Sequence, residues 1–443
     1  AVAIPNSEQQ ICEILKICEK YKVPIVTRGA GTGLSGGATP VGNCIILSTA
    51  KLNKVISIDE NQRIARVQPG VKNITISEKA APYNLFYAPD PSSQIACSIG
   101  GNVAENSGGV HCLKYGLTLN NIFRLRAVNY KGEVFEVGLE SFDSPGFDIL
   151  ALLVGSEGML AVITEISVKL LPKPSFAKVI SASFDDVEKA ANAVAGIISE
   201  GVIPAGLEMM DQGMIKAVEE FVNAGYDTEA KAILLCESDG DIGEVEEEIS
   251  IMKSILLGFG ATKIAISKTD EERNLFWAGR KNAFPASGRI SPDYYCIDGT
   301  IPRKKLGEML TKIKELEKKY KLTCNNVFHA GDGNLHPLIL FDSAKKGDFT
   351  KTEKFGEEIL KLCVKLGGVI TGEHGVGIEK RELMCEMFNN NDIQQQISIK
   401  NSLDPSSLLN PGKVYPILRK CAEEGRLHIH GRDKSKFSDI PRF

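Results

Sequence analysis

The glycine-rich stretch RGAGTGLSGGATP, residues 28–40, sets the interpretation of the first half of the chain. Five of its thirteen residues are glycine. A glycine inside a regular element costs roughly 0.5–1 kcal/mol relative to alanine, because glycine loses more backbone freedom on folding. A cluster of this density therefore indicates left-handed backbone angles or a ligand that lies directly against the main chain.

The loop does not match the common nucleotide-binding motifs. A Walker loop requires Gly-Lys-Ser/Thr after its second glycine, and that sequence is missing here. The dinucleotide fingerprint opens a long helix, whereas Gly29-x-Gly31-x-Gly33 is followed by LSGGATPVGN, which disfavours a helix. Two interpretations remain. Successive backbone N–H groups form a concavity for an anion such as phosphate, or the segment is a glycine-rich turn without a ligand.

Composition narrows the class of protein. The 443 residues are 43% hydrophobic, which is enough for a large core and predicts two or three domains. The net charge of −4 does not indicate a protein that binds nucleic acid. No apolar run reaches the roughly 18 residues of a membrane span. No signal-peptide pattern is seen. Because residue 1 is Ala and AVAIP reads as a strand already under way, we expect the natural chain to begin further upstream.

The cysteines predict thiols rather than a framework of disulfides. The eleven cysteines include no CxxC pair, so we expect small buried side chains in a reducing cytoplasm. The usual spacings of an iron–sulfur cluster are also missing from this chain.

Hydrophobic periodicity predicts a strand-rich first half and a second half in which strands alternate with helices. A helix begins after Ser7, with Gln10 completing a capping box. Strands are predicted over 23–26, 44–48, 55–59, 64–70, 122–130 and 133–138. From 177 the pattern alternates strands (177–184, 231–237, 261–266) with helices (185–199, 243–257), and further helices are predicted over 302–320 and 348–366. This second half indicates a ferredoxin-like α/β domain, followed from about 417 by a polar tail.

Two further patches resemble the first in their use of glycine. Residues 87–116, YAPDPSSQIACSIGGNVAENSGGVHCLKYG, contain two diglycines and are too long for a chance turn. Residues 154–164, VGSEGMLAVIT, place Glu157 between two glycines just before an apolar strand.

Together these patches resemble the flavin domain of the vanillyl-alcohol-oxidase (PCMH) type, in the branch of FAD-linked 2-hydroxyacid dehydrogenases. The motifs FHAGDGNLHP (328–337) and TGEHGVGIEKR (371–381) are similar to that branch's C-terminal domain. The tail resembles that of the FAD-linked subunits of bacterial glycolate oxidases. The resemblance implies an α+β fold: a two-part FAD-binding domain over 1–175, its N-terminal part missing, and a ferredoxin-like substrate (cap) domain over 176–416. A C-terminal helical segment returns to the flavin, and 417–443 is a polar tail.

The resemblance also implies residue roles for FAD. Residues Arg28, Gly29, Ala30, Gly31, Thr32 and Gly33 would wrap the pyrophosphate. The flavin and ribityl chain would be lined by Pro89, Asp90, Ser92, Gly100, Gly101, Asn102, Asn106 and Gly108. The adenine half would be held by Tyr115, Gly116, Glu157 and Ile163, and Asn410 is a further cofactor contact. Residues 28–37 contain no histidine of the kind that binds FAD covalently in some relatives, so we expect non-covalent FAD. His111 is expected to be structural.

Two histidines flank a hairpin signal. His329 ends an apolar run, His336 begins another, and the Asp-Gly pair between them favours a tight turn. Antiparallel strands would bring both imidazoles to the same end of a sheet, where they suit zinc or manganese, although a buried core histidine is the commoner use of such residues. Glu373 and His374, flanked by glycines, could supply a third ligand and a catalytic base.

The resemblance implies that His329, His336 and Glu373 would hold a divalent metal, Zn or Mn, and that His374 would face the substrate as the base. Arg280, beside the only tryptophan, would bind the substrate carboxylate, unless it is a surface arginine. Lys380 and Arg381 are alternatives for that role, but solvated helix charges are the more ordinary reading of both.

Substrate and partners follow from the same resemblance. Relatives that oxidise 2-hydroxyglutarate have a lysine at the position of Cys296 and an asparagine at that of Leu338, so a short acid such as glycolate or D-lactate is favoured. Electrons would pass to partner subunits including a separate iron–sulfur protein, with the chain cytoplasmic and associated with the inner face of the membrane only through partners. The alternatives are a D-lactate or D-2-hydroxyglutarate dehydrogenase that uses an electron-transfer flavoprotein or quinone, a metallohydrolase without flavin, and a non-catalytic binding subunit.

Overall fold

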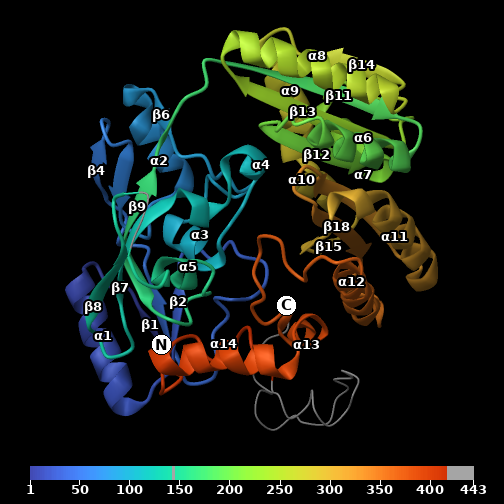
Figure 1. Ribbon diagram of the computed structural model, residues 1–443. Coiled ribbons are helices and arrows are strands. Elements are labelled where there is room, and N and C mark those ends of the chain that lie inside the picture. Colours follow the sequence, from blue (N-terminus) through green and yellow to red (C-terminus); the bar gives the residue numbers. More distant parts are fainter. Residues whose placement is uncertain (142–144, 417–443) are drawn as a thin grey trace. The chain divides into compact units, whose positions relative to one another are not determined.

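The computed structural model describes residues 1–141 and 145–416. The chain forms two compact units, which Figure 1 shows coloured along the sequence. The first unit comprises Ala1–Gly108, Gly116–Lys173 and the chain from Glu373 onward; the second comprises Gly109–Tyr115 and Pro174–Gly372. The predicted substrate domain over 176–416 includes residues of both units, because the chain from Glu373 onward belongs to the first unit. The predicted polar tail over 417–443 lies outside the described residues.

Among its described residues, the first unit contains three small sheets. A parallel sheet has the order β1-β3-β2, an antiparallel sheet has the order β4-β5-β9-β7-β8, and β10 pairs with β6. The strands are β1 (Val2–Ala3), β2 (Ile25–Arg28), β3 (Ile45–Ser48), β4 (Val55–Asp59), β5 (Ile64–Val67), β6 (Leu85–Phe86), β7 (Ile122–Val128), β8 (Val134–Gly138), β9 (Val162–Lys169) and β10 (Leu171–Pro172). The helices are α1 (Glu8–Tyr21), α2 (Asn73–Ala80), α3 (Ile99–Glu105), α5 (Ile149–Leu153), α13 (Met384–Met387) and α14 (Asn390–Leu403), with short 3-10 turns at Ala81–Tyr83, Thr118–Asn121 and Arg381–Leu383.

The second unit is built on one eight-stranded antiparallel sheet of order β14-β11-β13-β12-β17-β18-β15, with β16 also pairing with β18. Its strands are β11 (Phe176–Phe184), β12 (Gly206–Asp211), β13 (Ala232–Gly240), β14 (Lys263–Ile266), β15 (Asp293–Cys296), β16 (Gly299–Thr300), β17 (Thr323–His329) and β18 (Asn334–Phe341). Its helices are α4 (Cys112–Tyr115), α6 (Val187–Ser199), α7 (Gln212–Val222), α8 (Ile242–Gly258), α9 (Asp270–Lys281), α10 (Ala283–Ile290), α11 (Leu306–Tyr320) and α12 (Asp348–Lys365), with a 3-10 turn at Arg303–Lys305.

One core lies between this sheet and helices α7, α9 and α10. Side chains of β12, β13, β17 and β18 that alternate along their strands point into it, and Trp277 of α9 packs among them. The same alternation decides which polar side chains of these strands share that face. The site described below therefore follows from the register of the sheet.

Most predicted elements are present within a few residues of their expected bounds. Ser7 caps α1, because its Oγ accepts from the Gln10 amide at 3.3 Å. The periodicity missed β12, β15, α7, α9 and α10. It also missed α3, inside the stretch read as a long loop, where Ser98 Oγ accepts from the Gly101 amide at 3.4 Å. Gly100 is required there, because a Cβ would lie 2.5 Å from the Cβ of Pro69.

Two findings bear on the broader expectations. Among the described residues, no helix is both long and apolar enough to cross a membrane. Free thiols are found at Cys12, Cys18, Cys44, Cys97, Cys112, Cys236, Cys296, Cys324 and Cys363. Cys385 is disulfide-bonded, so the expectation of thiols throughout was wrong at that position.

Candidate functional site

The glycine-rich loop of the first unit follows β2 and remains without a helix, as predicted. Residues 30–34 are exposed, and the amides of residues 29–34 donate no hydrogen bond to any described residue. Gly31 has a φ of +78°, a conformation that other residues rarely adopt. Exposed amides on a glycine loop are able to bind anionic oxygens or water, so the geometry is compatible with both interpretations.

The other predicted cofactor positions lie on several elements. Asn73 ties two of them together, because its Nδ2 donates to the Pro89 carbonyl at 3.0 Å and to Asn102 Oδ1 at 3.1 Å. Tyr115 belongs to the second unit, where its hydroxyl donates to Asp239 at 2.7 Å. In the first unit, Asp90 and Ser92 lie between β6 and α3, Gly100 and Gly101 in α3, Asn106 and Gly108 after it, Gly116 after α4, and Ile163 in β9.

Glu157 and Asn410 are fully engaged inside the first unit. The carboxylate oxygens of Glu157 accept from the amides of Val376 and Gly377, each at 2.7 Å. Asn410 Nδ2 donates to the Gly37 carbonyl at 2.9 Å and to that of Glu157 at 2.7 Å. These side chains therefore hold loops of the unit together, whatever contact they make with a cofactor.

The sheet register brings the polar residues of the second unit to one place. His329 and His336 flank the hairpin turn, as predicted, and their ring centroids are 5.0 Å apart in an edge-to-face arrangement. His329 pairs in register with Glu208 of the neighbouring strand β12. Because side chains alternate along a strand, all three lie on the face covered by α7, α9 and α10.

Glu208 joins the histidine pair to Arg280. One oxygen of Glu208 lies 2.7 Å from His329 Nδ1, and the other accepts from Arg280 Nε at 2.6 Å. Burial opposes ionisation of this carboxyl, but the charges and hydrogen bonds of His329 and Arg280 outweigh burial and hold its pKa below the ordinary value. When the His329 ring is neutral, an ionised Glu208 favours the tautomer that carries its proton on Nδ1, and the lone pair is then on Nε2.

A second carboxylate fixes the chain just before Glu373. Asp298 is fully buried, and its Oδ2 accepts from the Thr371 hydroxyl at 2.7 Å and from the Gly372 amide at 2.9 Å. Its other oxygen lies 3.8 Å from His336 Nε2. Gly372 also packs on the histidine hairpin, because a Cβ there would lie 2.3 Å from Asn334 Oδ1. Glu373, the next residue, is the point at which the chain enters the first unit.

The three basic candidates for carboxylate binding are placed differently. Arg280 is 4% exposed, so it is not a surface arginine. Lys380 is 0% exposed and lies in the first unit, so the reading of it as a solvated helix charge was wrong. Arg381 pairs with Glu382 at 2.8 Å and donates to the Gly412 carbonyl. Arg280 is bound to the carboxylate of Glu208, which also contacts His329.

Sequence reasoning missed Glu208 and Asp298. The available signal for Glu208 was a lone carboxylate in the apolar run GLEMM, since an unpaired charge is expensive inside a core. Asp298 gave no such signal, because it lies in a short loop after β15 where an aspartate is ordinary.

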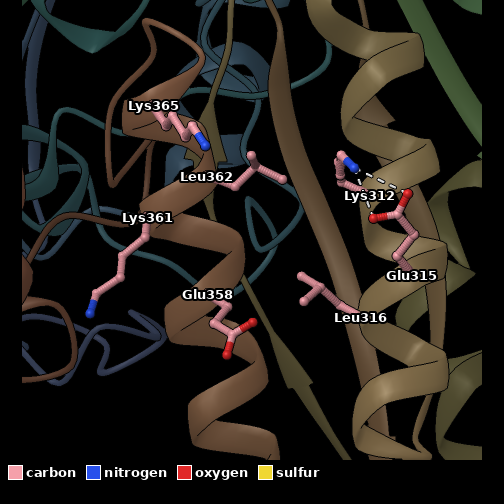
Figure 2. Close-up of a pocket in the computed structure, with 7 residues that line it drawn as sticks. All are labelled: Lys312, Glu315, Leu316, Glu358, Lys361, Leu362 and Lys365. Atoms are coloured by element: carbon pink, nitrogen blue, oxygen red, sulfur yellow. Dashed lines mark hydrogen bonds and ion pairs between the residues drawn. The ribbon is translucent and has the colours of Figure 1, made fainter.

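A pocket elsewhere in the second unit contributes nothing to this site. It lies between α11 and α12 (Figure 2) and has a volume of about 280 Å³. Its lining residues are Lys312, Glu315, Leu316, Glu358, Lys361, Leu362 and Lys365. Lys312 and Glu315 pair with each other at 2.8 Å, and no imidazole lines the pocket. It resembles an ordinary charged groove between two helices.

Family models match both halves of the chain. The model described as "FAD linked oxidases, C-terminal domain" matches residues 173–414, and the model described as "FAD binding domain" matches residues 1–138. The chain belongs to the FAD-linked oxidases. The resemblance drawn from the sequence motifs and the α+β fold expected from it are confirmed, and the metallohydrolase without flavin loses its support.

Individual relatives cover nearly the whole chain. The glycolate oxidase subunit GlcD of Escherichia coli (strain K12) is 54% identical over 442 residues, which are 100% of this chain and 88% of that protein. GlcD of Bacillus subtilis (strain 168) is 37% identical, covering 94% of this chain and 88% of its own length. A D-lactate dehydrogenase of Archaeoglobus fulgidus is 33% identical, covering 93% and 90%.

Solved structures of lower sequence identity share the fold. A p-cresol methylhydroxylase structure is 17% identical, with a TM-score of 0.79 over 94% of this chain and 89% of the other. The 4-ethylphenol oxidase of Gulosibacter chungangensis is 18% identical, with a TM-score of 0.77 over 94% and 90%. At these identities the likeness concerns the fold alone.

Proposed function

We propose that this FAD-linked oxidase converts a short 2-hydroxyacid, glycolate or D-lactate, to the 2-oxoacid and passes the electrons to partner subunits. The observation that carries the proposal is the buried Glu208 carboxylate, which binds His329 and Arg280 at once. Glu208 thus connects His329, an imidazole suited to binding a metal, with Arg280, a cation suited to binding a substrate carboxylate. The relatives named glycolate oxidase subunit and D-lactate dehydrogenase point to the same substrate class.

The first unit would hold FAD without a covalent bond. The unused amides of residues 29–34 suit its pyrophosphate, and the cofactor positions on α3 and in the loops beside it would line the flavin. When bound, FAD supplies the acceptor for a hydride.

The proposed metal ligands are two histidines of the second unit and Glu373, the residue at which the chain enters the first unit. Two imidazoles with a carboxylate are typical ligands of zinc and manganese, and we assign these roles to His329, His336 and Glu373. Glu208 would orient the ring of His329, as carboxylates beside metal-bound histidines commonly do. A metal at these ligands supplies Lewis acidity, which lowers the pKa of the substrate hydroxyl.

Arg280 and His374 complete the proposed chemistry. The bond to Glu208 uses Nε of Arg280, and the terminal nitrogens carry the other N–H donors, which we assign to the substrate carboxylate. His374 takes the hydroxyl proton. The C–H bond breaks, its electron pair leaves with the hydrogen as hydride, and the C–O bond becomes a carbonyl. The alcohol thus loses one proton and one hydride to become the 2-oxoacid.

The sheet register supports a short substrate. Cys296 of β15 pairs in register with Leu338 of β18, and Leu338 lies two residues beyond His336 on the same face. The two positions that carry polar groups in 2-hydroxyglutarate oxidisers are therefore neighbours, and both are occupied here by side chains that offer no cation or amide. A second carboxylate on the substrate would meet no partner from either.

Substrate identity is tested by flavin reduction. We expect anaerobic mixing of the FAD-loaded protein with glycolate or D-lactate to bleach the flavin spectrum, at least about tenfold faster than D-2-hydroxyglutarate, since an unpaired buried charge costs binding energy. A stopped-flow absorbance series over these acids, with L-lactate included, makes the comparison. Bleaching by 2-hydroxyglutarate alone would contradict the proposal.

The orienting role of Glu208 is tested by Glu208→Gln. We expect metal affinity to fall about 10–100-fold, the usual effect of losing a carboxylate behind a histidine ligand. Titration with zinc or manganese followed by calorimetry measures it. Glu237→Gln is the matched control, because Glu237 is a buried carboxylate on the adjacent strand that binds Trp277 and His111 instead. Equal affinities for the two variants would rule out the role.

A further inference from the structure

We propose that Glu157 is a positioning residue that fixes the proposed base His374 to the unit carrying the flavin loops; this rests on the function proposed above. The loop that follows His374 turns through Gly375 and Gly377, whose φ angles are +83° and +53°. Within this loop, the backbone amides of Val376 and Gly377 both donate to the carboxylate of Glu157, each at 2.7 Å. Successive backbone N–H groups of this kind form a concavity for an anion, and here the anion is a side chain.

Glu157 is itself rigidly held. Its φ of +50° places it in the left-handed region, and its amide donates to the Ala104 carbonyl at 2.8 Å at the end of α3. Its carbonyl accepts from Asn410, which also binds Gly37 in the glycine-rich loop. Because its amide and its carbonyl are both hydrogen-bonded, the backbone of Glu157 is fixed. The loop that its carboxylate binds is therefore fixed as well.

The same loop is also tied to the glycine-rich segment directly. The amides of Ile378 and Glu379 donate to the Ser35 carbonyl at 2.9 and 3.2 Å. A Cβ on Gly377 would lie 2.1 Å from that carbonyl, so only glycine allows the approach. His374 therefore begins a loop anchored at Glu157 and Ser35, and both anchors belong to the first unit.

A second buried carboxyl, Glu105, provides a matched control. A Cβ on Gly375 would lie 2.3 Å from Glu105 Oε2 and 2.8 Å from Glu157 Oε1, so both carboxyl groups border this glycine. Glu105 Oε2 is buried and has no hydrogen-bond partner among the described residues. Burial and the charge of Glu157 raise the pKa of Glu105 well above its ordinary value, so a neutral amide is a close substitute for it.

The experiment compares Glu157→Gln with Glu105→Gln in the full-length, FAD-loaded protein. The amide group of glutamine accepts through one atom only, so Glu157→Gln leaves one of the two backbone N–H groups facing a donor. We expect hydrogen–deuterium exchange of the peptide covering 373–383 to accelerate about tenfold or more, the equivalent of one lost bond to a charged group. Exchange in Glu105→Gln should match the wild type.

Turnover separates positioning from a general loss of stability. We expect Glu157→Gln to lower kcat about 10–100-fold with little change in KM, because a misplaced group costs transition-state rather than ground-state binding. In a His374→Gln background the same change should have no further effect, since it acts through the base. Should Glu157→Gln fail to fold, Glu157→Asp retains the charge with a shorter reach and should give an intermediate exchange rate.

Failure of this inference differs from failure of the proposed function. If His374→Gln is slow while Glu157→Gln keeps wild-type exchange and turnover, the positioning role is overturned and the base assignment stands. An additive loss in the double variant likewise overturns it. If His374→Gln turns over at the wild-type rate, the base assignment fails, and the exchange data alone decide whether Glu157 holds the loop.

Discussion

Replacing His374 with glutamine is expected to lower kcat for glycolate or D-lactate by about 10²–10⁴-fold, the range that a positioned general base contributes. Glutamine retains a similar size and hydrogen-bonding capacity but accepts no proton near neutral pH. Because glutamine does not titrate, we also expect the pH dependence of kcat/KM that a general base contributes to disappear. Anaerobic stopped-flow reduction of the flavin, recorded from pH 5 to 9, measures both effects.

The control for this variant is His111→Gln. His111 binds Glu237 through Nε2 at 3.3 Å in the second unit and has no assigned part in the reaction. We expect its loss to change thermal stability, because a partly buried contact to Glu237 is removed. We expect kcat to stay within about twofold, because His111 has no assigned contact with the reacting groups. Retained flavin content in both variants shows that the cofactor is still bound. A His374→Gln enzyme as fast as the His111→Gln enzyme would remove His374 from the mechanism.

Removing a metal ligand is the second large effect. We expect His336→Ala to lose the bound metal and to lower kcat/KM by about 10²–10³-fold, because Lewis-acid stabilisation is worth several kcal/mol. Elemental analysis of the purified variant and steady-state kinetics check the two parts. Chelation of the wild type should give the same loss, and added zinc or manganese should restore the wild type but not the variant.

Two outcomes would contradict the metal assignment. Full activity of a metal-stripped wild type is the first, since the proposed chemistry needs the hydroxyl to be activated. Equal metal content in His336→Ala and His111→Gln is the second, because it would place the metal elsewhere. The fully buried position of His336, within 3.8 Å of Asp298, makes a specific effect expected rather than a general loss of surface charge.

The local parts of the site could be predicted because local sequence determines them. The glycines of the first loop indicated exposed amides, and the Asp-Gly turn indicated the hairpin that brings His329 and His336 together. Both features depend on backbone preferences over a few residues. Homologous motifs then supplied the flavin-linked family, and the family models agree.

The partners of these residues required the tertiary structure. Glu208 meets His329 only because β12 pairs with β17 in a particular register, across 121 positions of sequence. Shifting that register by one residue would turn Glu208 to the other face of the sheet. Likewise, Glu157 reaches the amides of Val376 and Gly377 across about 220 positions. No local preference encodes contacts of that range.

By itself, then, the sequence indicated the candidate segments: a glycine-rich loop, a histidine hairpin, and a glutamate–histidine pair between glycines. Only the tertiary structure decided which carboxylate orients each of them, and that the chain crosses from one unit to the other between Gly372 and Glu373. The physical reason is that turns and glycine loops are set by backbone torsions of neighbouring residues, whereas strand register and burial are set by the packing of the whole core.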